Sequence, residues 1–260
     1  MAIDQLHRII TIENRPQRIV SVVPSQTELL YDLGLENQVV GITKFCIHPP
    51  QWFKTKTRVG GTKNLAIERI KNLNPDLIIA NKEENTKDQI EELAKFFPVW
   101  ISDIHDIADS LQMIRTIGDI TFTSAKASII IERIEQQRYQ LKKNINLLKP
   151  KKVAYFIWKD PWMLAGSDTF IHSMISEAGF CNIISSPRYP SLSDEEITEL
   201  SCDYFFLSSE PYPFKQKHIE ILQNLNQNAK TILVDGELFS WYGSRIMKSF
   251  EYFASLHEIL

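Results

Sequence analysis

The segment RIVSVVPSQTELLYDLG (residues 18–34) has the pattern of a buried strand followed by a helix. Its first part, IVSVV, is rich in β-branched residues and nearly continuous in apolar ones, as strands of parallel sheets are because both of their faces are covered. Ser25, followed three residues later by Glu28, predicts a capping box for a helix over 26–33, and Gly34 is a helix-ending signal. The segment therefore predicts the strand–helix unit of an α/β fold.

Strands and helices alternate on both sides of this segment. Because the same patterns recur, we expect strands at 9–12, 39–42, 76–80 and 99–101, helices at 67–73 and 85–96, and a loop over 43–64. Alternation at this spacing indicates an α/β lobe with a largely parallel sheet flanked by helices.

An unusually long helical pattern follows this first lobe. Thr123 or Ser124 can cap it, and neither glycine nor proline interrupts it before Pro150. Residues 124–148 would form a helix about 37 Å long, which exceeds the depth of one small lobe. We therefore predict an N-terminal α/β lobe over 1–122, a connector helix over 123–149 and a C-terminal α/β lobe over 150–260.

The second half of the chain echoes the first. IERIKNLNPDLIIAN (67–81) aligns without a gap with DEEITELSCDYFFLS (194–208), and VWISD (99–103) aligns with TILVD (231–235). The alignment places Asp76 opposite Asp203. Ordered matches of this kind predict a pseudo-duplicated protein with two similar lobes.

Composition and charge exclude several classes of protein. The chain has 260 residues, of which 43% are apolar and 23% charged, as in ordinary globular proteins. A net charge of −3 argues against the strongly basic surface that nucleic-acid binding requires. No run of 18 apolar residues occurs, so no membrane-spanning segment is expected.

The N-terminus and the cysteines bear on the compartment. The start, MAID, lacks the basic and apolar regions of a signal peptide, so either the protein stays in the cytosol or an export signal is missing from this sequence. Cys46, Cys181 and Cys202 have no CxxC spacing, and we expect three buried thiols rather than a disulfide framework.

The loops after the predicted strands are unusually rich in large side chains. Ligands of open α/β sheets bind at the carboxyl ends of the strands, which makes these loops the candidate site. They carry Phe45, His48, Trp158, Trp162, Met163, Tyr212, Phe214, Phe239, Trp241 and Tyr242. Each ring alone could instead pack beneath its loop, but the set favours a large, flat, partly apolar ligand.

Polar and charged side chains are interleaved with these rings. They are Lys44, Lys82, Glu83, Glu84, Asn85, Lys159, Arg188, Glu210, Asp235 and Arg245, each of which could also be a solvated surface residue. The helix that begins near Ser25 directs free backbone N–H groups to the same region, which suits an anionic or carbonyl group.

Catalytic and metal-binding patterns are absent from the sequence. It has no GxSxG, GxxxxGK[ST], GxGxxG or HExxH motif, and no two histidines lie four residues apart. Cys46 and His48 could share a metal, but a strong site needs two further ligands. Ser167 and Asp168 are expected to cap a helix. We therefore expect a non-catalytic protein.

Several motifs, taken in order, resemble a known family. RIVSVVPSQTELLYDLG, VVGITKFCIHP, RVGGTKN and LNPDLIIANKEEN resemble the N-terminal lobe of class III substrate-binding proteins, the helical-backbone receptors of ABC importers for cobalamin, siderophores and haem. The connector helix, MLAGSDTFIHSMISEAGFCNI and DGELFSWYGSRI extend the similarity over about 18–260. GITKFCIHP and WYGSR are most similar to the cobalamin-binding branch.

This resemblance implies a fold and a site. Members have two lobes, each with a small central sheet flanked by helices, and bind the ligand between them. In this sequence Phe45, Trp158, Trp162, Phe239, Trp241 and Tyr242 occupy the matching loops. Taken together with the analysis of the loops, the ligand-binding candidates are Pro24, Ser25, Gln26, Lys44, Phe45, His48, Asn81, Glu84, Asn85, Trp158, Trp162, Met163, Arg188, Tyr189, Glu210, Phe239, Trp241, Tyr242 and Arg245.

The resemblance also implies a docking partner. Family members bind the permease through an acidic residue on each lobe, for which Glu83, Glu84, Asp88 and Glu220 are candidates, with Glu210 a further candidate in the second lobe. Lys87 stands where we align the family's glutamate, a departure from the pattern.

The expected function is that of a monomeric, periplasmic substrate-binding protein for a corrinoid, without a cofactor, a metal site of its own, nucleic-acid binding or membrane insertion. Two alternatives stay open. One is a ferric-siderophore or haem receptor of the same family, which the cationic set Lys44, Lys82, Lys159, Arg188 and Arg245 would suit. The other is a cytosolic enzyme or a metal-chelate handling factor that uses the same cleft.

Overall fold

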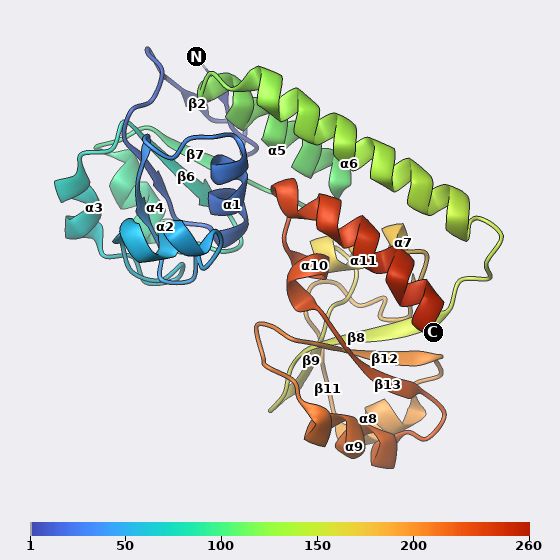
Figure 1. Cartoon of the computed structure of the whole chain (residues 1–260). Helices are drawn as coiled ribbons and strands as arrows, with labels where there is room; N and C mark the ends of the chain where they lie inside the picture. The colour runs from blue at the N-terminus through green and yellow to red at the C-terminus, as the bar shows by residue number, and fades with distance from the viewer. Residues whose placement is uncertain (1) are drawn as a thin grey trace. The chain divides into compact units, whose positions relative to one another are not determined.

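The computed structural model describes residues 2–260 and divides the chain into two compact units (Figure 1). Unit 1 comprises Met1–Ile104, Ala108–Ile134 and Tyr242–Arg245. Unit 2 comprises His105–Ile107, Glu135–Trp241 and Ile246–Leu260. A four-residue piece of the C-terminal half is therefore part of unit 1, an arrangement that no pattern in the sequence predicts.

Unit 1 is built on a five-stranded, entirely parallel sheet. The strands are β3 (Ile19–Ser21), β4 (Val39–Ile42), β5 (Thr57–Arg58), β6 (Leu77–Asn81) and β7 (Val99–Ser102), in the order β5-β4-β3-β6-β7. The helices of the connections are α1 (Pro24–Asp32), α2 (Pro50–Thr55), α3 (Ile67–Leu73) and α4 (Lys87–Ala94), and α5 (Ile107–Ile120) follows β7. Every residue of β3, β6 and β7 is buried, which explains their continuous apolar runs.

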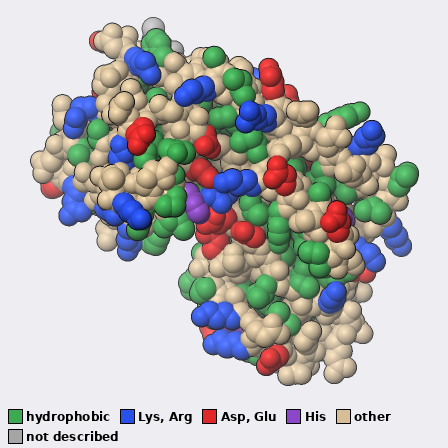
Figure 2. Space-filling model, viewed as in Figure 1, with side chains coloured by type: hydrophobic (Ala, Val, Ile, Leu, Met, Phe, Trp, Pro, Cys, Tyr) green, Lys and Arg blue, Asp and Glu red, His purple; other side chains and the backbone are tan. Residues whose placement is uncertain are grey.

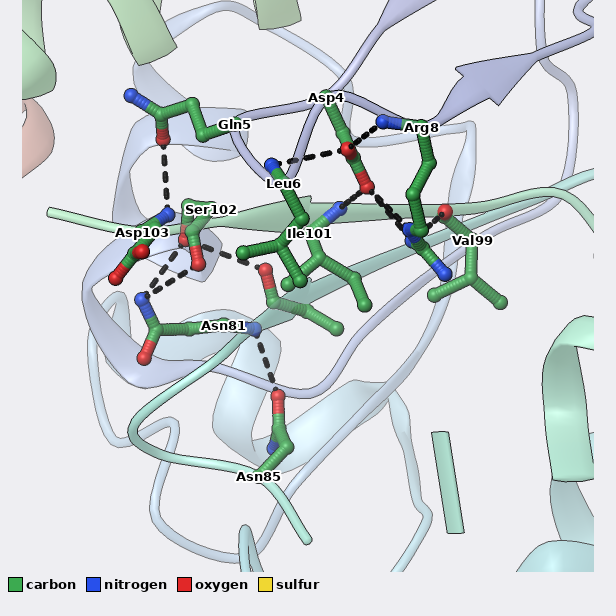
Figure 3. Close-up of polar contacts among 11 residues, drawn as sticks. Asp4, Gln5, Leu6, Arg8, Asn81, Asn85, Val99, Ile101, Ser102 and Asp103 are labelled. Atoms are coloured by element: carbon green, nitrogen blue, oxygen red, sulfur yellow. Dashed lines mark hydrogen bonds and ion pairs between the residues drawn. The ribbon is translucent and has the colours of Figure 1, made fainter. Parts of the chain in front are cut away.

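The N-terminal segment covers the open edge of this sheet. An antiparallel ribbon of β1 (Ala2–Ile3) and β2 (Ile9–Ile10) encloses a turn that lies along β7 (Figure 3). The Gln5 N–H donates to the Ile101 carbonyl at 3.1 Å, and the Arg8 guanidinium donates to the Val99 carbonyl at 2.9 Å. The buried Asp4 carboxylate accepts from the Ile101 N–H. These bonds satisfy backbone groups that an edge strand otherwise exposes.

The long helix is α6 (Ser124–Ile145), which runs without interruption and ends three residues before the predicted 148. Residues up to Ile134 belong to unit 1, and residues from Glu135 onward belong to unit 2. Within the described residues, no helix combines the length and the hydrophobicity needed to cross a membrane.

Unit 2 is built on a mixed sheet with a parallel centre. The strands β8 (Lys152–Trp158), β12 (Tyr204–Ser208) and β13 (Lys230–Val234) are parallel neighbours, and β10 (Cys181–Asn182) pairs with the start of β8. On the side of β8 away from β12, antiparallel β9 (Trp162–Leu164) pairs with the end of β8, and β11 (Ser191–Leu192) pairs with β9. The helices are α7 (Phe170–Glu177), α8 (Asp194–Glu199), α9 (Gln216–Leu225), α10 (Gly236–Ser240) and α11 (Ile246–Ile259).

The internal repeat is confirmed at the level of single hydrogen bonds. The Asp76 carboxylate accepts from the Arg18 N–H at 2.8 Å, and the Asp76 N–H donates to the Arg18 carbonyl at 3.0 Å. In unit 2, Asp203 exchanges the same two bonds with Lys152, at 2.7 and 2.8 Å. Each aspartate thus ties the starts of two neighbouring parallel strands, β3 with β6 and β8 with β12.

Two predicted helix caps are wrong. No capping box forms at Ser25, because α1 begins at Pro24 with Val23 as its N-cap and without a side-chain cap bond. Glu28 instead binds Arg245, a partner that lies 217 residues away in the chain. In unit 2, Thr169 rather than Ser167 or Asp168 caps α7, accepting from the His172 N–H at 3.1 Å. The predicted loop over 43–64 also contains α2 and β5.

Candidate functional site

The carboxyl edge of the unit 1 sheet is a topological switch point. In the sheet, β4 lies on one side of β3 and β6 on the other. The connection after β3 leads to β4 and the connection after β6 leads to β7, so the two loops run in opposite directions. Open α/β sheets bind ligands in the crevice at this point. Pro24, Ser25 and Gln26 follow β3, and Asn81 ends β6.

Buried amide side chains tie the strand ends together at this edge (Figure 3). The Asn81 amide donates to Ser102 Oγ at 3.0 Å, and the Gln26 amide donates to the same oxygen. Asn85 accepts from the Asn81 N–H at 2.8 Å and donates to the Val22 carbonyl at 3.2 Å. Asn81, Gln26 and Asn85, all predicted ligand residues, therefore bind neighbouring protein groups. Gln26 Oε1 is buried without a hydrogen-bond partner among the described residues.

Two predicted residues reach this edge from the C-terminal half. Burial raises the pKa of Tyr242 well above its usual value, and the Ser25 and Ser102 hydroxyls offset part of that effect. The Arg245 guanidinium forms a two-pronged ion pair with Glu28, with N–O distances of 2.6 and 2.9 Å. Both of these side chains are buried, at 7% and 8% exposure.

The outer part of the unit 1 edge presents an exposed ring. Phe45 is 50% exposed, and the Lys44 Nζ lies 5.0 Å from its ring centroid. A side chain at Gly61 would meet both residues at 3.2–3.3 Å, so glycine leaves room for this pair. His48 is half-buried at the end of the same loop.

Cys46 lies beneath this loop, where its Sγ is 3.1 Å from the hydroxyls of Thr27 and Thr43. Burial raises its pKa.

Acidic residues lie in the loop after β6 and in the helix that follows it. Asn81 Oδ1 accepts from the N–H groups of Glu83 and Glu84, both at 2.8 Å, which orders the backbone of that loop. The two glutamates are half-buried, and Asp88 is exposed in the first turn of α4. In unit 2, Glu220 is exposed on α9. Figure 2 shows acidic and basic side chains interspersed on the face in view, in keeping with the small net charge of −3.

At the carboxyl edge of unit 2, the two tryptophans near β8 differ in accessibility. Trp158 is 40% exposed and meets Tyr212 edge-on, with ring centroids 5.5 Å apart. Trp162 is buried, stacks on Phe214 at 6.3 Å, and donates its indole N–H to Asp194 at 2.7 Å. Met163, beside it, is half-buried.

The loops after β12 and β13 meet through Glu210. Its Oε1 accepts from the Trp241 indole N–H at 2.8 Å and from the Ser240 hydroxyl at 3.1 Å. Burial raises the pKa of Glu210, and the nearby carboxylates of Glu237 and Asp235 act in the same direction. Trp241 is nearly buried.

Phe239 is buried, whereas Arg188 and Tyr189 are more accessible to solvent. Phe239 is fully buried in the core of unit 2, with its ring centroid 5.1 Å from that of Tyr155 and 4.7 Å from that of Phe253. Arg188 is exposed with a φ of 63°, and its guanidinium lies 5.6 Å from the ring centroid of the half-buried Tyr189.

The structure thus separates the predicted aromatic set into two groups. Phe45, Trp158 and Tyr212 keep accessible ring surface, whereas Trp162, Phe239, Trp241 and Tyr242 are packed against protein.

Sequence reasoning missed Ser102, where two buried amides converge, and Glu28. The alignment of VWISD with TILVD points to the strand end that holds Ser102, but no local pattern indicates the partner of Glu28.

The prediction of three buried thiols is wrong. Only Cys46 is buried, while Cys202 is half-buried and Cys181 is exposed at the start of β10. Among the described residues, no group of three or more His, Cys, Asp or Glu side chains could hold a metal ion.

We expect one fast-reacting thiol in the folded protein. Burial raises the pKa of Cys46, and burial together with the neighbouring Asp203 raises that of Cys202 to about 12, so both stay protonated and shielded near pH 8. Titration with Ellman's reagent should show one rapid equivalent, assigned to the exposed Cys181, and C181S should remove it. A rapid equivalent that persists in C181S would contradict the assignment.

Comparisons with known proteins support the family resemblance that the sequence motifs indicated. Residues 19–230 match the model of a family described as "Periplasmic binding protein". The chain is 27% identical over 209 residues to the uncharacterized ABC transporter substrate-binding lipoprotein YvrC of Bacillus subtilis, covering 77% of this chain and 66% of that protein. It is also 27% identical over 190 residues to a vitamin B12-binding protein of Pectobacterium atrosepticum, covering 70% of this chain and 68% of that protein. The matches thus span about two thirds of the length of these curated relatives.

Solved structures share the fold. The periplasmic vitamin B12-binding protein BtuF of Vibrio cholerae superposes with a TM-score of 0.81 at 20% identity, covering 94% of this chain and 98% of that chain. The periplasmic heme-binding protein HutB of Vibrio cholerae superposes with a TM-score of 0.78 at 25% identity, covering 93% and 98%. The predicted fold class and the resemblance to substrate-binding proteins are therefore confirmed.

Proposed function

Because the chain belongs to the periplasmic binding protein family, we propose that it is the substrate-binding component of an ABC importer and that its ligand is a corrinoid. Relatives named for vitamin B12 binding support the choice of ligand. In this proposal the protein holds its ligand without converting it, and α6 is the connector between the lobes.

The accessible aromatic surface at the strand ends carries the proposal. In unit 2, Trp158 is the last residue of β8 and its ring meets that of Tyr212, which follows β12. In unit 1, Phe45 follows β4. A wide, partly apolar macrocycle gains affinity by covering such rings, and indole and phenol groups add polar contacts at the rim. The exposed Arg188 and the Lys44 beside Phe45 add cationic groups for the polar periphery of the ligand.

Docking to a permease is part of the same proposal. Glu83 and Glu84 lie on a loop that Asn81 holds in place, and Asp88 and Glu220 are exposed on helices. Carboxylates at such positions suit ion pairs with arginine side chains of a partner. We accordingly propose a location outside the cytoplasmic membrane, as the descriptions of the relatives suggest.

A haem receptor is the second candidate. The likeness to a heme-binding protein favours it, as do the cations beside aromatic rings, with Lys44 over Phe45 and Lys159 at 5.0 Å from the Trp162 ring. Ammonium groups at the edge of a ring site would suit the propionates of haem.

Calorimetric titration tests the choice of ligand. Cyanocobalamin should bind with a Kd between nanomolar and micromolar, about −8 to −12 kcal/mol. Trp158→Ala should weaken this binding by ~1–3 kcal/mol, because an accessible aromatic anchor is lost. Tyr139→Ala is the matched control, since Tyr139 is 66% exposed on α6 and follows no strand, so its loss should leave affinity unchanged.

Parallel titrations with haemin and with a ferric catecholate separate the alternatives. Tight binding of haemin without heat from cyanocobalamin, at tens of micromolar protein, would favour the haem receptor. Tight binding of only the catecholate would identify a siderophore receptor. Equal affinity in the wild type and Trp158→Ala would remove this ring from the site.

A further inference from the structure

A short segment near the C-terminus, residues 240–245 (the strap), changes unit along its length. Ser240 and Trp241 belong to unit 2, whereas Tyr242–Arg245 belong to unit 1. The chain then returns to unit 2 with α11. Each end of the strap is bound by a carboxylate of the unit in which that end lies.

The first end is bound in unit 2. Glu210, in the loop after β12, accepts from the Trp241 indole at 2.8 Å and from the Ser240 hydroxyl at 3.1 Å through the same Oε1 atom. Burial raises the pKa of Glu210, and the carboxylates of Glu237 and Asp235 act in the same direction. The two hydrogen bonds favour the charged carboxylate and act in the opposite direction.

The second end is bound in unit 1. The Arg245 guanidinium meets Glu28 of α1 in a two-pronged ion pair, at 2.6 and 2.9 Å, with both side chains buried. This geometry fixes the direction of the side chain as well as its position.

The middle of the strap lies at the carboxyl edge of unit 1. Gly243 has a φ of 85°, a left-handed conformation that favours glycine, and its N–H donates to Ser110 Oγ at 3.0 Å. This turn places Tyr242 beside Ser25, which follows β3, and Ser102, which ends β7. Tyr242 is thus a C-terminal residue at the switch point of the N-terminal sheet.

We propose that Glu210 and Glu28 are positioning residues that hold the strap at its two ends. Glu210 orients the Trp241 indole at the edge of unit 2. Glu28 acts through Arg245 and orients Tyr242 at the edge of unit 1. Neither carboxylate needs to touch a ligand in this role. The carboxyl edge of unit 1 is incomplete without Tyr242–Arg245, which the chain supplies between two segments of unit 2.

Tryptophan NMR tests the first end without any ligand. The five tryptophans of the chain give five indole N–H signals, and W241F identifies that of Trp241. Loss of the hydrogen-bond acceptor in Glu210→Ala should move this signal upfield by more than any other indole signal. Asp194→Ala is the matched control, because Asp194 binds the Trp162 indole at 2.7 Å and its loss should move only that signal. An unmoved Trp241 signal in Glu210→Ala would overturn this half of the proposal.

Amide hydrogen exchange tests the second end. In Glu28→Gln, exchange of the Gly243 amide should accelerate by about tenfold or more, while amides of β3 stay protected, because the strap is released before the sheet opens. Glu68→Gln, in an exposed ion pair with Lys71, is the control and should change neither. Equal acceleration at Gly243 and in β3 would show that Glu28 serves general stability only, and would overturn this half.

The consequence for binding rests on the proposed function. Both Glu210→Ala and Glu28→Gln should weaken cyanocobalamin binding by about tenfold, equal to ~1.4 kcal/mol, because the packed ring that shapes each edge loses its fixed orientation. Wild-type protein that binds no cyanocobalamin would contradict the proposed function, while the indole signals and amide exchange would still decide the role of the strap. Unchanged affinity in both variants of a binding protein would overturn the link between strap and ligand.

Discussion

Replacing Glu28 with alanine is expected to lower the free energy of unfolding of unit 1 by about 3–5 kcal/mol. Glu28 and Arg245 are joined by two short N–O contacts in a buried setting. Removing the carboxylate breaks a buried ion pair and takes both of these contacts from the guanidinium, which is far more costly than the loss of a surface contact. The effect should exceed that of any surface ion pair in the chain.

Urea denaturation followed by far-ultraviolet circular dichroism measures this loss. Two compact units can unfold separately, so the curves are fitted with two transitions, and the loss should fall on one of them. Glu68→Ala, which removes a carboxylate 81% exposed, is the control and should cost under ~1 kcal/mol. The double variant Glu28→Met/Arg245→Met should recover much of the loss, because it leaves no buried charge. A loss below ~1 kcal/mol in Glu28→Ala would refute the importance of the pair.

Phe239→Ala is expected to destabilise unit 2 by about 3–5 kcal/mol, as removal of a fully buried aromatic ring does. The Phe239 ring has no exposed surface and packs among Tyr155, Phe206 and Phe253, with the nearest centroid at 4.7 Å. Its substitution leaves a cavity in the core, and the surrounding rings relax only partly around it.

A second phenylalanine provides the comparison. Phe45 was also predicted to bind the ligand, but it is 50% exposed, so Phe45→Ala should change stability little and cyanocobalamin affinity more. Thermal and urea unfolding measure the first quantity, and calorimetry on protein verified to be folded measures the second. Phe239→Leu should restore most of the stability, since it refills much of the volume. A wild-type melting curve for Phe239→Ala would show that its ring is not part of the core.

Local patterns predicted most of the elements. The helix over 67–73 was found at the predicted residues, the strands at 39–42 and 99–101 agree to within one residue, and the 124–148 helix differs only at its end. The gap-free match of 67–81 with 194–208 placed Asp76 opposite Asp203, and the structure shows that these two residues make the same hydrogen bonds. These features depend on periodicity and on neighbours within a few residues, which the amino-acid order specifies directly.

The helix caps show where local reasoning failed. Ser25 and Glu28 have the spacing of a capping box, yet the carboxylate pairs with Arg245 instead. A charged guanidinium in a buried setting attracts the carboxylate more strongly than one backbone N–H does. Sequence spacing cannot reveal this competitor, because 217 residues separate the two side chains.

Short-range hydrophobic patterns were enough to predict the α/β class, the repeated strand–helix order and the strand ends at which the candidate site lies. Tertiary packing was needed to show that the rings of Phe45 and Trp158 stay accessible there, whereas those of Phe239 and Trp241 are packed inside. It also decided that Tyr242–Arg245 belong to unit 1. Burial and ion pairing are properties of what surrounds a side chain, and here the surroundings come from segments far away in the chain.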